Sequence, residues 1–179
     1  MNSDQKNSDR QWQPDSILYS RMKILVIDDE PANVALLEEM LAEGGYTRVK
    51  SVTDSRLALE ARETFEPDLV LLDLMMPHVD GFTILESFRA ACGEAFLPII
   101  VLTADVNEST KLRALRAGAT DFLLKPFDQL EVLLRMTNLL ETRRLHLQLD
   151  MQCAAYEEAV RERTSELREA QVQLQEAER

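Results

Sequence analysis

The chain has 179 residues, of which 45% are hydrophobic, so it can form one full-sized domain with a packed core and an appendage. Its formal net charge of −12 argues against a nucleic-acid-binding surface, which needs clustered lysines and arginines. It has two cysteines without metal spacing, no apolar stretch near the roughly 18 residues of a membrane span, and no signal-peptide core, so we expect a cytoplasmic protein with no membrane contact.

Residues 1–20 are mostly polar and cannot bury enough apolar surface to order themselves. We therefore expect a flexible leader over 1–20. Trp12 and the run 17–19 leave a second possibility open, in which the leader docks onto the domain that follows.

From Met22 onward, short aliphatic runs alternate with segments of helical length. Such runs are typical of parallel strands that are buried on both faces. Proline is favoured at the first position of a helix and glycine just beyond its end, and Pro31 and Gly44 occupy such positions around one predicted helix. Asp54 is a candidate cap for the next helix. The predicted strands are 22–27, 49–52, 68–73, 99–102 and 120–124, and the predicted helices are 31–43, 55–65, one that follows Asp80-Gly81 and ends near Cys92, and 107–117.

Five strands that alternate with helices predict an α/β fold, a doubly wound parallel sheet with right-handed crossovers. Strand order does not follow from alternation alone. Placing the acidic pair Asp28-Asp29 beside Asp73 favours the order 2-1-3-4-5 of flavodoxin-like sheets, because its switch point lies between the first and third strands.

Four of the predicted strands end on residues that can handle a phosphoryl group, namely Asp28-Asp29, Asp73, Thr103 and Lys125. Ligands of open α/β sheets bind outside the carboxyl ends of the strands, so these side chains should converge. Adjacent carboxylates suit Mg²⁺, which takes one or two carboxylates plus phosphate oxygens. An aspartate can act as nucleophile toward a phosphoryl group, with a lysine and a hydroxyl binding the phosphoryl oxygens.

Each of these residues also has a plain structural interpretation. Asp28 and Asp29 could cap the helix that starts at Pro31, and Asp73 or Thr103 could cap other helices. Lys125 could be an ordinary surface charge. The combination of all of them at one sheet edge favours the phosphoryl site.

The segments ILVIDDE, LVLLDLMMPHVDGF, IIVLTA and DFLLKPF resemble those of a response-regulator receiver domain, the phosphoacceptor module of two-component signalling. The resemblance covers residues 22 to about 140. It implies that Asp73 accepts a phosphoryl group from a sensor histidine kinase or phosphotransfer protein.

The same resemblance implies that Asp29 binds Mg²⁺ directly, that Asp28 helps to hold it, and that Asp73 and the Met75 backbone carbonyl are further ligands. It also implies a cis peptide bond between Lys125 and Pro126. Phe122 occupies the position of the family's switch aromatic, which turns inward as the threonine (here Thr103) follows the phosphoryl group. A plain core phenylalanine is the other interpretation of Phe122.

Residues 128–179 contain neither glycine nor proline and predict a long C-terminal helix. Its first part should pack on the sheet, which gives a receiver domain over 21–140 and a helical extension over 141–179. In the extension, a heptad seam predicts a homodimeric coiled coil through residues 145–179, with a solvated single helix or a frayed tail as the alternative. The seam residues are Leu149, Cys153, Tyr156, Val160, Arg163, Leu167, Ala170, Leu174 and Ala177.

The leading functional hypothesis is a Mg²⁺-dependent receiver that is not itself an enzyme and that signals through the dimeric helix to an output domain missing from this sequence. A stand-alone adaptor is the alternative within the same class. A metal-dependent phosphohydrolase with an aspartyl nucleophile is disfavoured, because such enzymes place a second aspartate where this chain has Met75. A flavin carrier is disfavoured by the lack of a Ser/Thr/Gly-rich loop after the first strand.

Overall fold

The computed structural model describes residues 20–177, with the exception of residues 94 and 106. The predicted leader over 1–20 therefore lies almost entirely outside the described residues. Contacts divide the chain into two units, 1–143 and 144–179, which are described separately below.

Strands and helices alternate through the first unit, as the sequence pattern predicts. The helix predicted over 55–65 begins with a short 3₁₀ turn, which Asp54 caps by accepting the Arg56 backbone N–H at 3.0 Å. The elements are β1 (Lys23–Ile27), α2 (Pro31–Glu43), β2 (Arg48–Val52), η1 (Ser55–Leu57), α3 (Ala58–Phe65), β3 (Leu69–Asp73), α4 (Gly81–Cys92), β4 (Ile99–Thr103), α5 (Glu108–Arg116), β5 (Asp121–Leu124) and α6 (Gln129–Ala177).

The sheet has five strands, all of whose pairings are parallel, in the order β2-β1-β3-β4-β5. The predicted flavodoxin-like order 2-1-3-4-5 and the long C-terminal helix are thus confirmed. The connection from β2 to β3 passes β1, so strands are added first on one side of β1 and then on the other, and the carboxyl ends of β1 and β3 flank the switch point of the sheet.

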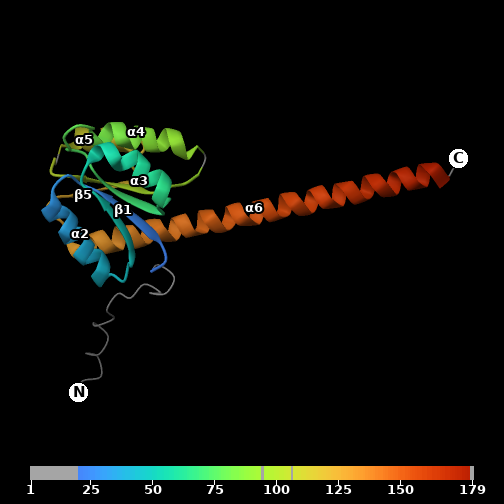
Figure 1. Cartoon of the computed structure of the whole chain (residues 1–179), viewed down its shortest axis with the longest axis horizontal. Helices are drawn as coiled ribbons and strands as arrows, with labels where there is room; N and C mark the ends of the chain where they lie inside the picture. Colours follow the sequence, from blue (N-terminus) through green and yellow to red (C-terminus); the bar gives the residue numbers. More distant parts are fainter. Residues whose placement is uncertain (1–19, 94, 106, 178–179) are drawn as a thin grey trace, which may run out of the picture. The chain divides into compact units, whose positions relative to one another are not determined.

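The core consists of two clusters on opposite faces of the sheet, because successive residues of a strand point to opposite sides. In β1, Ile24 and Val26 face α2 and α6, whereas Leu25 and Ile27 face α3, α4 and α5. Figure 1 shows this layering, with α4 and α5 on one side of the sheet and α2 and the start of α6 on the other. All of β3 and β4 is buried, which explains their uninterrupted aliphatic sequences.

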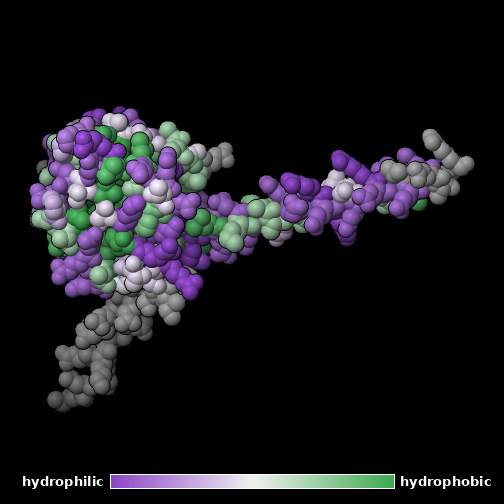
Figure 2. Space-filling model, in the orientation of Figure 1, coloured by the Kyte–Doolittle hydropathy of each residue, from purple (hydrophilic) through white to green (hydrophobic). Residues whose placement is uncertain are grey.

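Helix α6 changes character along its length. Val132, Met136 and Leu140 are fully buried and belong to the core. In the second unit, every residue whose side chain is described is exposed or half-exposed. Figure 2 shows a mostly hydrophilic surface along this unit, with an apolar stretch near its beginning, where Leu145, Leu149 and Met151 are exposed. Within the described part of the chain, no helix combines the length and the apolar content that a bilayer crossing requires.

The loop between β3 and α4 folds back tightly onto the end of β3. The Gly81 N–H donates to the Leu74 carbonyl at 3.2 Å. A Cβ atom at Gly81 would lie 2.2 Å from the Asp73 carbonyl oxygen and 2.6 Å from the Leu74 Cα. Both are backbone atoms, so a side chain at this position would displace the end of β3 or the start of α4.

We therefore expect Gly81→Ala to reduce the free energy of unfolding by about 1–3 kcal/mol, the usual cost of overpacking. Urea denaturation followed by circular dichroism measures the change. Gly45→Ala is the control, because its Cβ would meet nothing within 4 Å and only the positive φ of 84° opposes it. A loss for Gly81→Ala no larger than that of the control would contradict the steric argument.

Candidate functional site

The strand register brings four of the predicted site residues to one edge of the sheet. Asp28 directly follows β1, Asp73 and Thr103 are the last residues of β3 and β4, and Lys125 directly follows β5. The neighbouring pairs Asp73↔Leu102 and Thr103↔Leu124 show that these strand ends lie level with one another. Because β1, β3, β4 and β5 are consecutive in the sheet, residues nearly a hundred positions apart meet here.

Three carboxylates form the centre of the site. Asp28, Asp29 and Asp73 each offer an oxygen atom, and these atoms lie within 4.8 Å of one another. Asp28 is fully buried and Asp73 is 4% exposed, whereas Asp29 is half-buried. Like charges at this separation and burial repel strongly unless a cation compensates them.

Lys125 supplies one positive charge to this cluster. Its Nζ atom lies 2.7 Å from Asp28 Oδ2 and 2.7 Å from Asp73 Oδ2. Burial acts to lower the pKa of Lys125, but the hydrogen bonds to the two carboxylates outweigh it and place the pKa above its ordinary value. The ammonium group therefore stays charged across the neutral pH range.

The remaining charge of the cluster matches a divalent cation. The ammonium of Lys125 balances one of the three carboxylates, so a divalent cation would make the site neutral. The available donors are hard carboxylate oxygens, the ligands that Mg²⁺ prefers. The donor set therefore fits magnesium, with Asp28, Asp29 and Asp73 as the side chains that would hold it.

Asn33 and Ser55 support the site, and sequence reasoning overlooked both. The Asn33 side-chain amide donates to Asp28 Oδ1 at 3.1 Å and to Oδ2 at 3.2 Å, while the Glu30 N–H donates to Oδ1 at 2.9 Å. The position of Asn33 in the first turn of α2, above the end of β1, is the signal that could have identified it.

Ser55 is a buried polar residue, 4% exposed, that fixes the loop after Asp73. Its hydroxyl donates to the Pro77 carbonyl at 2.6 Å and accepts the Val79 N–H at 3.1 Å. No local sequence signal predicts this contact, since Ser55 follows β2 and the loop follows β3. In the same loop the Met75 N–H donates to Asp73 Oδ1 at 3.2 Å, and the role of the Met75 carbonyl stays a prediction.

Thr103 and Phe122, the two residues predicted to take part in switching, differ in their burial and in their neighbours. Thr103 is 2% exposed at the end of β4, and its Oγ1 accepts the Asp105 N–H at 3.0 Å. Phe122 lies outside the carboxylate cluster, half-buried, with Lys111 Nζ 4.8 Å from the centre of its ring and Arg135 5.9 Å from it.

Two further features of the loops beside the site are the hydrogen bonds of Asp105 and the peptide bond between Lys125 and Pro126. Asp105 accepts the Thr110 hydroxyl at 2.6 Å and the Asn107 N–H at 2.9 Å, and these hydrogen bonds lower the pKa of its carboxyl. The Lys125–Pro126 peptide bond is cis.

Comparison with known proteins identifies the family. The family model of the response regulator receiver domain matches residues 24–137. The alkaline phosphatase synthesis transcriptional regulatory protein PhoP of Bacillus subtilis is 40% identical over 118 residues, which cover 66% of this chain and 48% of that protein. The response regulator PleD of Caulobacter vibrioides is 37% identical over 117 residues, which cover 65% of this chain and 26% of PleD. The chain thus spans half or less of the length of these curated relatives.

Solved structures agree with this match. The receiver domain of the sensor histidine kinase PA1611 from Pseudomonas aeruginosa PAO1, which has a magnesium ion in its active-site cleft, is 32% identical with a TM-score of 0.61. The two structures correspond over 67% of this chain and 98% of that one. The receiver domain of the Francisella response regulator 1452 is 29% identical with a TM-score of 0.63, over 68% of this chain and 98% of that one. This chain therefore belongs to the response regulator receiver domain family, the phosphoacceptor domains of two-component signalling.

Proposed function

We propose that Asp73 is the phosphoacceptor of this receiver and that a sensor histidine kinase or a phosphotransfer protein is the donor. The observation that carries the proposal is the convergence of Asp73 with Lys125, Asp28 and Asp29 at one sheet edge. Among these carboxylates, Asp73 is the last residue of the central strand β3, and Lys125 holds its Oδ2 at 2.7 Å.

The proposed reaction is a phosphoryl transfer between two protein side chains. An Asp73 carboxylate oxygen attacks the phosphorus of a phosphohistidine, a P–O bond forms as the P–N bond breaks, and the released imidazole takes up a proton. Magnesium, when bound, neutralises and orients the phosphoryl oxygens. Lys125 offers its ammonium to one phosphoryl oxygen and the Thr103 hydroxyl donates to another. Phe122 is proposed to follow Thr103 as the switch aromatic.

Replacement of Asp73 by Asn should abolish phosphorylation, because the amide lacks the nucleophilic oxygen anion. The measurement is incubation of the full chain with acetyl phosphate and Mg²⁺, followed by assay of acid-labile, hydroxylamine-sensitive phosphate. Asp150→Asn removes an exposed carboxylate elsewhere and serves as the control. Unchanged phosphate uptake by Asp73→Asn would show that another residue is the acceptor.

We propose that Asp29 is the main protein ligand of Mg²⁺, with Asp28 and the Met75 carbonyl in support. Asp29→Ala removes a proposed direct ligand and should lower the Mg²⁺ affinity by at least the roughly tenfold seen when a residue that merely orients a metal ligand is removed. The unliganded variant should be as stable as the parent or more so, since carboxylate repulsion is relieved.

Isothermal titration calorimetry with MgCl₂ tests this expectation, with Glu86→Gln as a control that removes a carboxylate from the exposed face of α4. A Kd for Asp29→Ala equal to that of the control would reject the assignment. Phosphorylation that continues in excess chelator would reject the metal requirement as a whole.

We further propose that the second unit forms a parallel coiled-coil homodimer through residues 145–179 and passes the phosphorylation state to an output domain. In the unpaired helix, Leu149, Val160, Leu167 and Leu174 are between 56% and 67% exposed, and Tyr156 is 73% exposed. An exposed apolar stripe of this kind is typical of an interaction surface. Arg163 also lies on the seam and pairs with Glu166 of its own helix at 2.6 Å, which should keep the dimer modest in strength.

The receiver domain spans 21–140 and the helical extension 141–179 in this proposal. A stand-alone adaptor without an output domain is the alternative.

The proposed phosphoryl transfer to Asp73 takes place in the cytoplasm, where histidine kinases use ATP. The net charge of −12 disfavours direct contact of this chain with nucleic acid.

Light scattering on the full chain should give a mass of twice 20.4 kDa. Leu167→Lys places a charge in the seam and should shift the mass toward that of the monomer, whereas the off-seam control Ser165→Lys should not. Equal masses for both variants would place the interface elsewhere.

The switching role is tested with spin labels at Ser165→Cys in a chain whose native Cys92 and Cys153 are both replaced by Ala, so that no other thiol reacts. Beryllofluoride with Mg²⁺ should change the distance between the labels, and unchanged distances would reject the switching role.

A further inference from the structure

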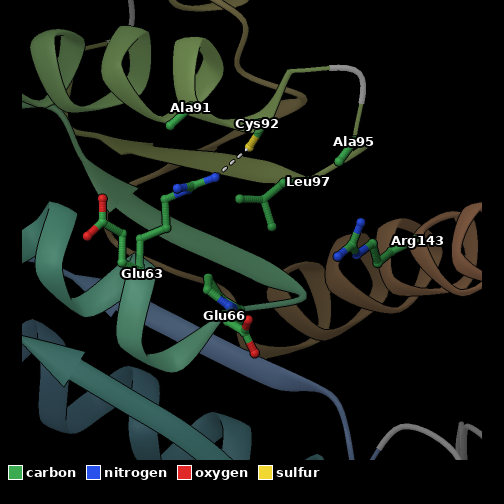
Figure 3. Close-up of a pocket in the computed structure, with 9 residues that line it drawn as sticks. Glu63, Glu66, Ala91, Cys92, Ala95, Leu97 and Arg143 are labelled. Atoms are coloured by element: carbon green, nitrogen blue, oxygen red, sulfur yellow. Dashed lines mark hydrogen bonds between the residues drawn. The ribbon is translucent and has the colours of Figure 1, made fainter.

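A second cavity lies at the edge of the sheet opposite the carboxylate cluster. Its volume is about 440 Å³, within the range of small-molecule sites. Figure 3 shows it between α3, the end of α4, the segment that leads into β4, and α6. Pro67 and Leu97, which line it, precede the first residues of β3 and β4, whereas the carboxylates lie beyond the last residues of these strands. The length of a strand therefore separates the two sites.

Two arginines from distant parts of the chain line this cavity, Arg62 of α3 and Arg143 of α6. The Nε atoms of both are buried and have no hydrogen-bond partner among the described residues. A buried donor without an acceptor costs free energy, and the cost is greater for a charged group.

These two guanidinium groups make few other contacts with the residues that the structure describes. Arg62 Nη2 donates to Cys92 Sγ at 3.3 Å, a weak acceptor, and the group lies 5.7 Å from the ring centre of Phe88. Arg143 Nη1 donates to the Phe96 carbonyl at 2.5 Å, and its Nε is 3.7 Å from Asp68 Oδ1, beyond hydrogen-bonding distance.

Other half-buried arginines of the domain are satisfied by protein groups. Arg89 donates to the carbonyls of Gly118 and Leu97 at 2.6 Å each and to Thr120 Oγ1 at 3.2 Å. Arg135 pairs with Asp121 and Glu131 at 2.7 and 2.6 Å. The two arginines of the cavity thus differ from the structural arginines of the same fold, because their donor capacity is largely unused.

The described acidic residues around the cavity compensate the two arginines unequally. The Glu66 side chain is 81% exposed and pairs with Lys23 at 3.7 Å. Glu63 is exposed and lies on the side of the cavity away from Arg143 (Figure 3). Asp68 forms an ion pair with Arg143, its Oδ1 lying 3.7 Å from Arg143 Nε, and its Oδ2 accepts the Lys23 backbone N–H at 2.9 Å. Among the described residues, Arg62 therefore has no carboxylate partner, and its positive charge stands uncompensated in a protein of strongly negative net charge.

We propose that this cavity binds a small anion through carboxylate or phosphate oxygens, held between Arg62 and Arg143. The planar guanidinium fork matches either group in a two-point contact. Pro67, Ala91, Ala95 and Leu97 give the cavity apolar walls, which suit the hydrocarbon part of a short organic acid. The proposal is independent of phosphorylation at Asp73.

Succinate and inorganic phosphate are the two probes, each titrated at constant ionic strength into the full chain after passage over a chelating resin. The resin removes divalent cations, so phosphate gains no metal at the carboxylate cluster and no soluble carboxylate chelator competes with the probe. Because the net charge of −12 repels anions in general, saturable binding points to a local cationic site. Succinate binding alone identifies an organic acid as the ligand class, and binding of both identifies a general oxygen-anion site.

Arg62→Gln and Arg143→Gln should each weaken binding about tenfold or more, the effect of losing one charge-assisted hydrogen bond. Arg116→Gln removes an exposed arginine of α5 and should bind like the parent chain. Arg62→Lys keeps the charge without the fork and should show intermediate affinity. Circular dichroism verifies that each variant keeps its helix content.

Backbone amide NMR spectra locate the bound anion. Shifts concentrated at Cys92, Leu97 and Arg143, with none at Asp73 or Lys125, are the expected result. Saturable binding that both Gln variants retain, or the absence of saturable binding of either anion, would overturn the proposal.

Discussion

Two buried carboxylates held side by side are the constraint on which the rest of this structure depends. Asp28 and Asp73 are nearly inaccessible to solvent, and Lys125 bridges them with two contacts of 2.7 Å. Burying charge is costly unless every group is paired, so the carboxylates need the hydrogen bonds from Asn33, Glu30 and Met75 as well. Even then the cluster keeps an excess of negative charge. The site is therefore stable enough to fold but incompletely neutralised, which is a suitable state for binding a cation and a phosphoryl group.

The parallel sheet makes this arrangement possible. The central strands β3 and β4 are buried on both faces, so they tolerate polar side chains only where the strand ends. The site residues occupy these ends, and the order β2-β1-β3-β4-β5 makes the ends neighbours. Because the strands are parallel, their amino ends also lie together, at the opposite edge of the sheet. There Arg62 and Arg143 line a cavity.

Much of the fold and of the candidate site could be predicted, because both depend on local patterns. Aliphatic runs identified the strands, and the position of Asp28 and Asp73 at strand ends identified the strand order. Asn33, Ser55 and the arginines of the second cavity were overlooked for a physical reason. Their hydrogen-bond partners are close in space but distant in the sequence. Arg143 donates to the Phe96 carbonyl, and the Ser55 hydroxyl donates to the Pro77 carbonyl. The 3₁₀ turn at Ser55–Leu57 was also missed, since a short turn and the first turn of an α-helix share the same capping residue.

The seven-residue repeat of α6 has a geometric consequence for any partner helix. A straight α-helix drifts by about 20° per heptad relative to such a repeat, so over four heptads the apolar stripe turns by about 80° around the helix axis. Two straight helices would separate before residue 177. To stay in contact they must wind around each other in a left-handed superhelix, so the length of the contact and the amount of winding are linked. A signal that lengthens or shortens the contact therefore also rotates whatever is attached at the far end.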